Sequence, residues 1–134
     1  MKIISPINLV LFSLIIVLST ACQDLVVEKK ITGRYYIIGV DTSDNLRLSY
    51  EVDSGNYIGI TKSNIKSIGF NKKYIITSSH IEDKKNAHYF IIPLEKEVNQ
   101  YWVDTLKIGP LNKSEFDRKS SELDIEDLKF TMFF

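Results

Sequence analysis

The chain has 134 residues, a formal net charge of zero and 25% charged residues, which is the size and balance of one ordinary domain. Its 17 basic residues are balanced by 17 acidic ones and are not gathered in a basic stripe, so nothing predicts binding to nucleic acid. The single cysteine, Cys22, excludes a disulfide framework and a metal site built on cysteines.

The first segment has the layout of a bacterial lipoprotein signal. An apolar run over residues 7–18 is shorter than the roughly 20 apolar residues that a membrane-spanning helix needs. The run ends in small residues and then Cys22, an arrangement typical of a cleaved signal peptide. We therefore predict a lipoprotein signal peptide over residues 1–21 and acylation of Cys22, for example with palmitate. Ordinary secretion and an uncleaved anchor are the alternatives.

Acylation would hold the mature chain at the bacterial cell envelope, on the periplasmic or extracellular face of a membrane. One acyl chain binds a bilayer only marginally, whereas a diacylated or triacylated cysteine anchors a protein stably. Residues 22–30 show no clear period, so we predict the lipidated cysteine and a tether there. A single β-rich globular domain is expected over residues 31–134.

Short runs of β-branched and aromatic residues, separated by turn residues, predict strands through most of this domain. Residues 46–52 alternate apolar and polar side chains, as a half-buried strand does. The continuous apolar run Tyr74–Ile76 predicts a strand covered on both faces. The apolar end, Met132–Phe134, is expected to dock in the core. We expect strands over residues 33–40, 46–52, 57–61, 65–70, 73–79, 88–93, 101–103 with 108–110, and 128–134.

One helix is predicted by its capping residues and by apolar residues on one face. Asn112 is the expected N-cap, and Glu115 three residues later completes a capping box. Leu111 and Phe116 form the pair of a hydrophobic staple, and Leu123 lies on the same face as Phe116. The expected fold is therefore α+β but mostly β, an antiparallel sheet of about seven strands with one late helix whose charged face is free for a partner.

The candidates for metal chemistry are the two histidines. His80 and His88 flank a predicted charged loop that also contains Glu82 and Asp83. A transition metal needs three or four ligands on a rigid frame, and these residues lack the usual ligand spacing. Asp41, Asp44 and Asn45 likewise do not make a calcium loop. We expect no metal and no cofactor.

Catalytic patterns are equally sparse. Ser78-Ser79-His80 is suggestive only by adjacency, because neighbouring strand residues point to opposite faces. No Gly-x-Ser-x-Gly motif occurs. The acidic pairs lie on or beside the helix, where they are expected to solvate its surface: Glu115 with Asp117, Glu122 with Asp124, and Glu126 with Asp127. The aromatic residues are expected to pack the sheet, with a ligand groove as the alternative: Tyr35, Tyr36, Tyr50, Tyr57, Tyr74, Tyr89, Tyr101 and Trp102.

Several short segments carry a family resemblance: Gly33–Ile38, Ile68–Ile76, Tyr101–Asp104, and Gly109–Asn112 with Glu115-Phe116. Together they resemble the DUF3997 family of small bacterial lipoproteins of unknown function. The resemblance covers most of the mature chain and implies an exported, anchored β-rich domain with one late helix. The family has no assigned activity, so the resemblance transfers no catalytic residue.

We therefore expect a lipid-anchored envelope protein that is not an enzyme and that binds or inhibits a partner, such as an envelope protein. The alternatives are a small envelope hydrolase that uses His80 or His88, and an immunity or protective lipoprotein.

Overall fold

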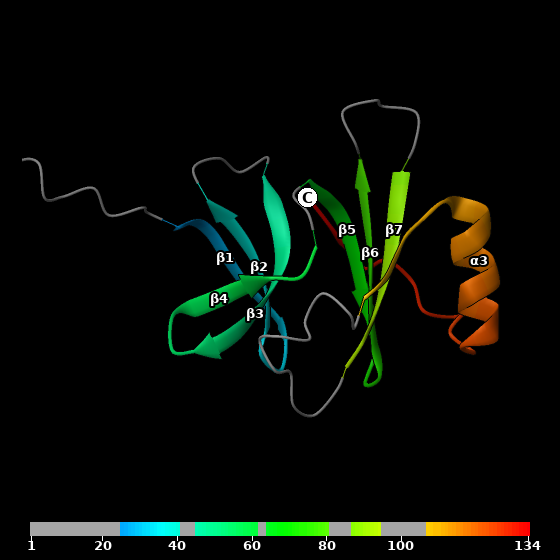
Figure 1. Cartoon of the computed structure of the whole chain (residues 1–134), viewed down its shortest axis with the longest axis horizontal. Helices are drawn as coiled ribbons and strands as arrows, with labels where there is room; N and C mark the ends of the chain where they lie inside the picture. The colour runs from blue at the N-terminus through cyan, green and yellow to red at the C-terminus, as the bar shows by residue number, and fades with distance from the viewer. Residues whose placement is uncertain (1–24, 41–44, 62–63, 81–86, 95–106) are drawn as a thin grey trace, which may run out of the picture.

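The structure is a computed structural model that describes residues 25–40, 45–61, 64–80, 87–94 and 107–134. Within these residues the chain forms two antiparallel sheets and one helix, α3 (Figure 1). Sheet A has the strand order β1-β2-β3-β4, and sheet B has the order β8-β7-β6-β5-β9. The bounds are β1 Leu25–Thr32, β2 Tyr35–Val40, β3 Leu46–Asp53, β4 Asn56–Gly59, β5 Ile65–Phe70, β6 Tyr74–His80, β7 Ala87–Pro93, β8 Ile108–Leu111, α3 Lys113–Glu122 and β9 Met132–Phe133.

The mostly β fold with one late helix is confirmed, but the strands form two sheets rather than one. The chain passes from sheet A to sheet B between β4 and β5. The alternation of side chains within a strand indicates which of its faces is buried but does not name the strand beside it. The residue pattern therefore predicts the strands from β2 to β8 and cannot divide them between sheets.

Sheet A begins with a strand where the sequence predicts a tether. β1 pairs antiparallel with β2 from Leu25 to Thr32, so the tether prediction over residues 22–30 is wrong for residues 25–30. The register of β1 shifts twice, between Leu25 and Val27 and between Lys30 and Thr32. Such bulges break the period-two alternation that would otherwise reveal a strand. Residues 22–24 lie outside the described residues.

Two of the gaps between the predicted strands, after residue 52 and after residue 70, form turns. Gly55 has a φ of 79° between β3 and β4, a left-handed conformation that glycine adopts without a steric penalty. Asn71 makes an Asx turn before β6, because its side-chain oxygen accepts hydrogen bonds from the backbone N–H groups of Lys73 and Tyr74, both at 2.8 Å. Each turn thus has a local cause that the sequence already shows.

The facing sides of the two sheets enclose the larger core, which we call the inner core. It is almost entirely aliphatic, apart from a tyrosine pair and one phenylalanine. Tyr35 and Tyr50 make an edge-to-face contact with ring centroids 5.1 Å apart. The buried members are Ile31, Tyr35, Ile37, Leu46, Leu48, Tyr50 and Ile60 from sheet A and its flank, and Ile65, Ile68, Ile75, Phe90 and Ile92 from sheet B.

A second cluster, the outer cluster, covers the opposite face of sheet B. Its buried members are Ile76, Ile91, Phe116 and Ile125, with half-buried apolar side chains around them. Ile75 lies in the inner core while its neighbour Ile76 lies in the outer cluster, which confirms that β6 is covered on both faces. The described chain therefore has three layers, namely sheet A, sheet B, and a layer of α3 with the segment that follows it (Figure 1).

The helix forms where its capping residues predict. The Asn112 side chain accepts from the backbone N–H of Glu115 at 2.9 Å, and the Glu115 carboxylate accepts from the Asn112 N–H at 2.8 Å. This reciprocal pair is the predicted capping box. Phe116 is buried, and Leu111 and Leu123 pack beside it in the outer cluster. Local hydrogen bonds begin the helix, and one ring fixes it to the sheet.

The segment after α3 crosses the outer face of sheet B in an irregular path, so the strand predicted over residues 128–134 is wrong except at β9. Its backbone passes so close to Gly69 that a Cβ atom there would lie 2.0 Å from the Lys129 carbonyl oxygen. Thr131 N–H donates to the Ile68 carbonyl at 2.9 Å, where the segment joins the sheet. Only the absence of a side chain at Gly69 permits this approach.

The expected docking of the apolar end is correct only in part. Met132 packs against the inner core, but Phe133 is 74% exposed and Phe134 37%. β9 pairs Met132 with Ile68 and Phe133 with Ser67. Successive residues of a strand point to opposite faces, so burying Met132 leaves Phe133 on the outer side.

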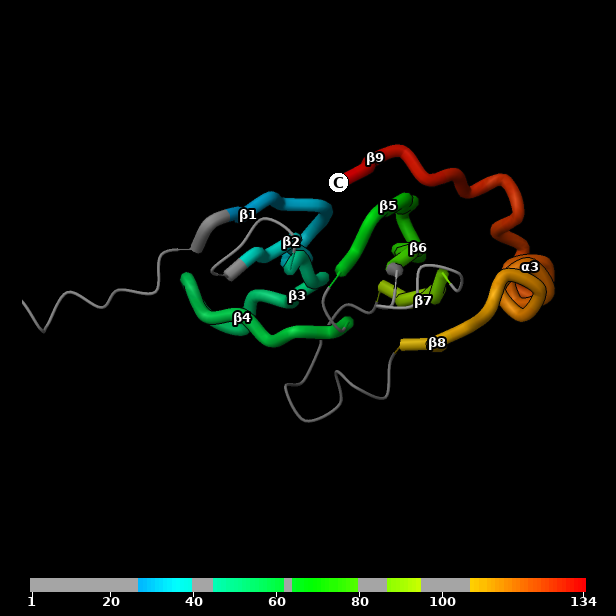
Figure 2. The backbone as a smooth tube through the Cα atoms, turned by 90° about the horizontal axis from the view of Figure 1, so that it is seen from above, coloured from blue at the N-terminus to red at the C-terminus, as the bar shows by residue number. Residues whose placement is uncertain are grey.

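The edges of the two sheets meet along two rims, which Figure 2 shows from above. β1 and β9 share one rim, and the Lys29 ammonium lies 5.6 Å from the Phe134 ring centroid across it. β4 and β8 lie along the opposite rim, where the Lys107 ammonium donates to the Ile60 carbonyl at 2.8 Å. A long cationic side chain thus spans the two sheets on each rim.

Candidate ligand groove

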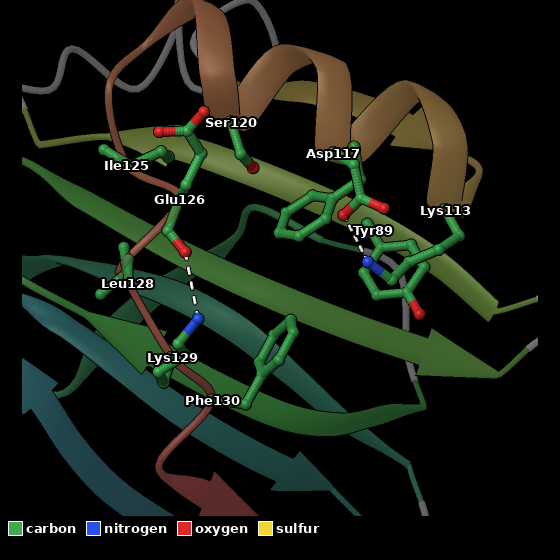
Figure 3. A pocket seen from close by; sticks show the side chains of 10 residues that line it. Tyr89, Lys113, Asp117, Ser120, Ile125, Glu126, Leu128, Lys129 and Phe130 are labelled. Atoms are coloured by element: carbon green, nitrogen blue, oxygen red, sulfur yellow. Dashed lines mark hydrogen bonds and ion pairs between the residues drawn. The ribbon is translucent and has the colours of Figure 1, made fainter.

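A groove lies between α3, the segment after it and the outer face of sheet B (Figure 3). We call it the outer groove, and its volume is about 600 Å³, which is within the range of small-molecule and side-chain binding sites. It exists because one helix and one irregular segment do not cover a five-stranded sheet completely. Its lining residues are Tyr89, Lys113, Phe116, Asp117, Ser120, Ile125, Glu126, Leu128, Lys129 and Phe130.

Three aromatic rings form the floor of the outer groove. Tyr89 from β7 stacks on Phe116 from α3 with centroids 4.8 Å apart and planes inclined by 26°. Phe130 from the later segment lies 6.1 Å from Phe116 and 6.3 Å from Tyr89. Rings at these separations attract one another and present a broad apolar surface. The floor can therefore accept a flat or branched apolar group.

Charged side chains form the two edges of the groove. Lys113 pairs with Asp117 along α3, and its ammonium also lies 5.8 Å from the Phe116 ring centroid. On the other side, the Lys129 ammonium donates to the Glu126 backbone carbonyl at 3.2 Å. Both pairs appear as dashed lines in Figure 3. One edge of the groove thus offers an ammonium paired with a carboxylate, and the other an ammonium bound to a backbone carbonyl, which suits a polar group attached to an apolar one.

One hydroxyl beside the groove finds no hydrogen-bond partner in the part of the chain that the structure describes. Ser120 lines the groove from α3, is 5% exposed, and its Oγ makes no hydrogen bond within the described residues. An unsatisfied buried hydroxyl costs roughly 1–3 kcal/mol. A polar group that enters beneath the helix would recover part of that energy. Ser120 adds a donor and acceptor to an otherwise apolar wall.

A second, smaller cavity of about 470 Å³ lies on the other side of Ile125. It separates the β5–β6 turn from the turn that ends α3, and its lining includes Lys72, Lys73, Asp124 and Asp127. Ile125 is buried and lines both cavities. This side chain packs in the outer cluster between the two cavities.

Most of the sequence-predicted site lies outside the described residues. This holds for Cys22, for Glu82 and Asp83, for Asp41 and Asp44, and for Tyr101 and Trp102. The register pairs His80 with Ala87 and His88 with Ser79, so the two histidines are not opposite one another. Among the described residues, no group of three His, Cys, Asp or Glu side chains is close enough to hold a metal ion.

The serines near His80 are engaged in structural contacts. Ser78 Oγ lies 2.5 Å from Ser67 Oγ on the neighbouring strand. Ser79 Oγ donates to the His88 backbone carbonyl at 3.4 Å. Neither described contact joins a serine hydroxyl to an imidazole, so the hydrolase alternative gains no support from them.

Two of the three acidic residues of α3, Asp117 and Glu122, form ion pairs within the helix. Asp117 contacts Lys113, and Glu122 contacts Arg118 at 3.0 Å and Lys119 at 2.9 Å. Hydrogen bonding to Lys119 holds the pKa of the Glu122 carboxyl below its usual range. The helix face that the sequence analysis leaves free for a partner is therefore largely neutralised. The outer groove beside it is the better candidate.

A separate aromatic pair lies on the outer face of sheet A. Tyr36 and Tyr57 meet edge to face with centroids 5.3 Å apart, and the Tyr57 hydroxyl donates to Glu28 at 2.5 Å. This hydrogen bond to a carboxylate raises the pKa of Tyr57 to about 12. The contact ties β4 to β1 across the sheet. Its geometry is that of a structural contact.

The fold and the groove together define a small three-layer β domain with an open aromatic site on its outer face. The sequence matches the family model described as "Protein of unknown function (DUF3997)" over residues 32–133, and the chain belongs to this family. No curated protein and no solved structure matches the chain. In the part that the structure describes, no helix is long and apolar enough to cross a membrane.

Sequence reasoning missed the outer groove as a site. Phe116 and Leu111 are recognisable as a staple, and Tyr89 as an aromatic of the sheet, but Phe130 is 14 positions beyond Phe116 (130 − 116). No sequence period joins these residues. Gly69 is the single local signal, because a glycine within a strand indicates a close approach by another backbone.

Proposed function

We propose that this protein is a lipid-anchored module of the bacterial cell envelope that binds a partner protein through the outer groove and has no catalytic activity of its own. Acylated Cys22 provides the anchor. The observation that carries the binding role is the aromatic floor of Tyr89, Phe116 and Phe130, open beside the buried Ser120 hydroxyl.

The chemistry of the groove suits an exposed apolar side chain on a partner. Its floor offers dispersion contacts and apolar burial, worth about 25 cal/mol per Å² removed from water. Lys113 and Lys129 at the edges of the groove could bind a backbone carbonyl or a carboxylate close to that side chain of the partner. An interface with an apolar centre and a charged rim is typical of protein recognition.

Anchoring is tested by changing the cysteine in the full-length chain. Cys22→Ser should move the protein from the detergent-rich to the aqueous phase, because no acyl chain is attached. Ser19→Ala, which keeps a small residue in the signal, is the matched control and should partition as the wild type does. Identical partitioning of Cys22→Ser and wild type would instead favour an uncleaved helix.

Binding is tested by photo-crosslinking in living cells. A photoreactive amino acid at Asp117 or Glu126, both exposed at the edges of the groove, should yield discrete adducts with an envelope protein. The same group at Ser54, an exposed residue of the β3–β4 turn, is the control and should yield none. Equal adducts from all three positions, or none from positions 117 and 126, would contradict a binding role for the groove.

A further inference from the structure

The β1/β9 rim carries the most exposed large apolar side chain among the described residues. Phe133 is 74% exposed and Phe134 is 37% exposed. They do not belong to a frayed end, because Phe134 N–H donates to the Lys66 carbonyl at 2.9 Å and β9 pairs in register with β5. The fold thus holds an aromatic side chain in water at a defined place.

This rim is also where the described chain begins. β1 starts at Leu25, three positions after Cys22 (25 − 22). An extended chain spans at most about 3.3–3.6 Å per residue, so Leu25 lies no more than roughly 10 Å from the Cα of Cys22. An acylated Cys22 would therefore keep the start of β1 at the headgroup level of the membrane. Figure 2 shows β9 on the same rim as β1.

The side chains along the rim have the chemistry of a membrane interface. Lys29 and Lys30 are exposed on β1, and the Lys29 ammonium lies 5.6 Å from the Phe134 ring centroid. Glu28, the acidic residue beside them, accepts the Tyr57 hydroxyl. Lysines near a bilayer are attracted to anionic headgroups, and exposed apolar rings bury themselves at the boundary with the acyl chains.

From these observations we propose that the β1/β9 rim lies against the bilayer that holds Cys22, with Phe133 inserted at the boundary of headgroups and acyl chains. The inference rests on the proposed lipid anchor. It orients the domain, because the opposite rim, with β4 and β8, then faces away from the membrane. The outer groove lies between these rims and stays accessible from the side.

The test uses a fluorescent side chain at the rim of the full-length acylated protein, reconstituted into phosphatidylcholine vesicles that contain phosphatidylglycerol. Trp102, the single tryptophan of the chain, is replaced by phenylalanine in every sample. Phe133→Trp then reports on the rim. Phe70→Trp is the matched control, because Phe70 is 37% exposed and lies at the end of β5 away from its pairing with β9.

We expect lipids brominated on their acyl chains to quench the indole at position 133, with a blue shift of its emission, and to leave the indole at position 70 unchanged. Iodide in the buffer should quench in the opposite order. Anchored protein whose indole at position 133 remains open to iodide would overturn this inference and leave the anchor intact. Protein that lacks acyl chains and does not sediment with the vesicles would overturn both proposals.

Discussion

The two faces of sheet B are covered in different ways. The inner core is closed by a second sheet, and Leu48, Ile37, Ile68 and Ile75 within it are completely buried. The outer cluster is closed by one short helix and an irregular segment, and most of its aromatic and aliphatic side chains remain half-buried. A sheet covers a sheet continuously, whereas one helix covers only a stripe of it. The incomplete outer layer is what leaves a groove.

The largest expected effect is a truncation in the inner core. Leu48→Ala removes a fully buried side chain and should lower the free energy of unfolding by roughly 4 kcal/mol, because the two rigid sheets cannot collapse around the cavity. Urea melts followed by circular dichroism measure this change. Ser54→Ala, at an exposed turn, is the control and should leave the midpoint unchanged.

The corresponding truncation in the outer cluster should have a smaller effect. Phe116→Ala should lower the free energy of unfolding by roughly 3 kcal/mol, near the lower limit for a phenylalanine, because its site borders an open groove that partly relaxes. The same urea melts compare it directly with Leu48→Ala. A larger loss for Phe116→Ala than for Leu48→Ala would contradict the view that the inner core dominates stability.

Gly69→Ala tests how the outer segment is attached. The added methyl group would meet the Lys129 carbonyl oxygen at 2.0 Å, so the segment must move away. This displacement should lower the free energy of unfolding by about 2 kcal/mol. The amides of Thr131 and Phe134, which donate to β5, should lose protection in hydrogen exchange. Gly59→Ala is the matched control, since its Cβ meets the Arg47 side chain at 3.3 Å and the Thr61 carbonyl oxygen only at 4.0 Å. Unchanged protection in Gly69→Ala would show that the segment does not cross there.

The helix cap gives a smaller effect confined to the outer layer. Asn112→Ala should lower the free energy of unfolding by about 1 kcal/mol, because the N–H of Glu115 loses its acceptor. Asn112→Asp retains a capping oxygen and should melt as the wild type does. Equal losses in the two variants would assign the effect to something other than the cap.

The smallest effect concerns pH on sheet A, far from the groove. The carboxylate of Glu28 raises the pKa of Tyr57 from 10.0 to about 12, so the folded protein retains this proton longer than the unfolded chain. The stabilisation is complete below pH 10 and is lost as the pH rises to about 12. The urea midpoint of wild type should fall more steeply over this range than that of Tyr57→Phe. Parallel curves would contradict the hydrogen bond to Glu28.

Local signals predicted the elements that depend on neighbouring residues. The capping box of α3, the alternation in β3, the turns at Gly55 and Asn71 and the double burial of β6 all follow from short stretches of chain. The predictions failed where the outcome depends on distant partners. β1 hides its period behind two bulges, and Phe133 is exposed because only Met132 of its pair can reach the inner core.

The candidate site was predictable only in fragments. The charged face of α3 was the expected contact surface, but Asp117 and Glu122 are paired with basic residues of the same helix. The groove beside it depends on Phe130 crossing sheet B to reach Tyr89 and Phe116, and no sequence period links these rings. The tyrosines also divide by position, since Tyr35 and Tyr50 lie in the inner core while Tyr89 lines the groove.

The sequence by itself determined the family, the strand-rich character and the capped helix, because short stretches of residues carry the signal for each, whereas the acylation of Cys22 stays a prediction. Only the tertiary structure decided how the strands divide between two sheets, which side of sheet B stays open, and which strands share a rim. Those features come from contacts between segments far apart in the chain. Side-chain packing between the sheets and the close approach of the segment after α3 to Gly69 fix how these segments are arranged. The groove and the exposed Phe133 are properties of that arrangement.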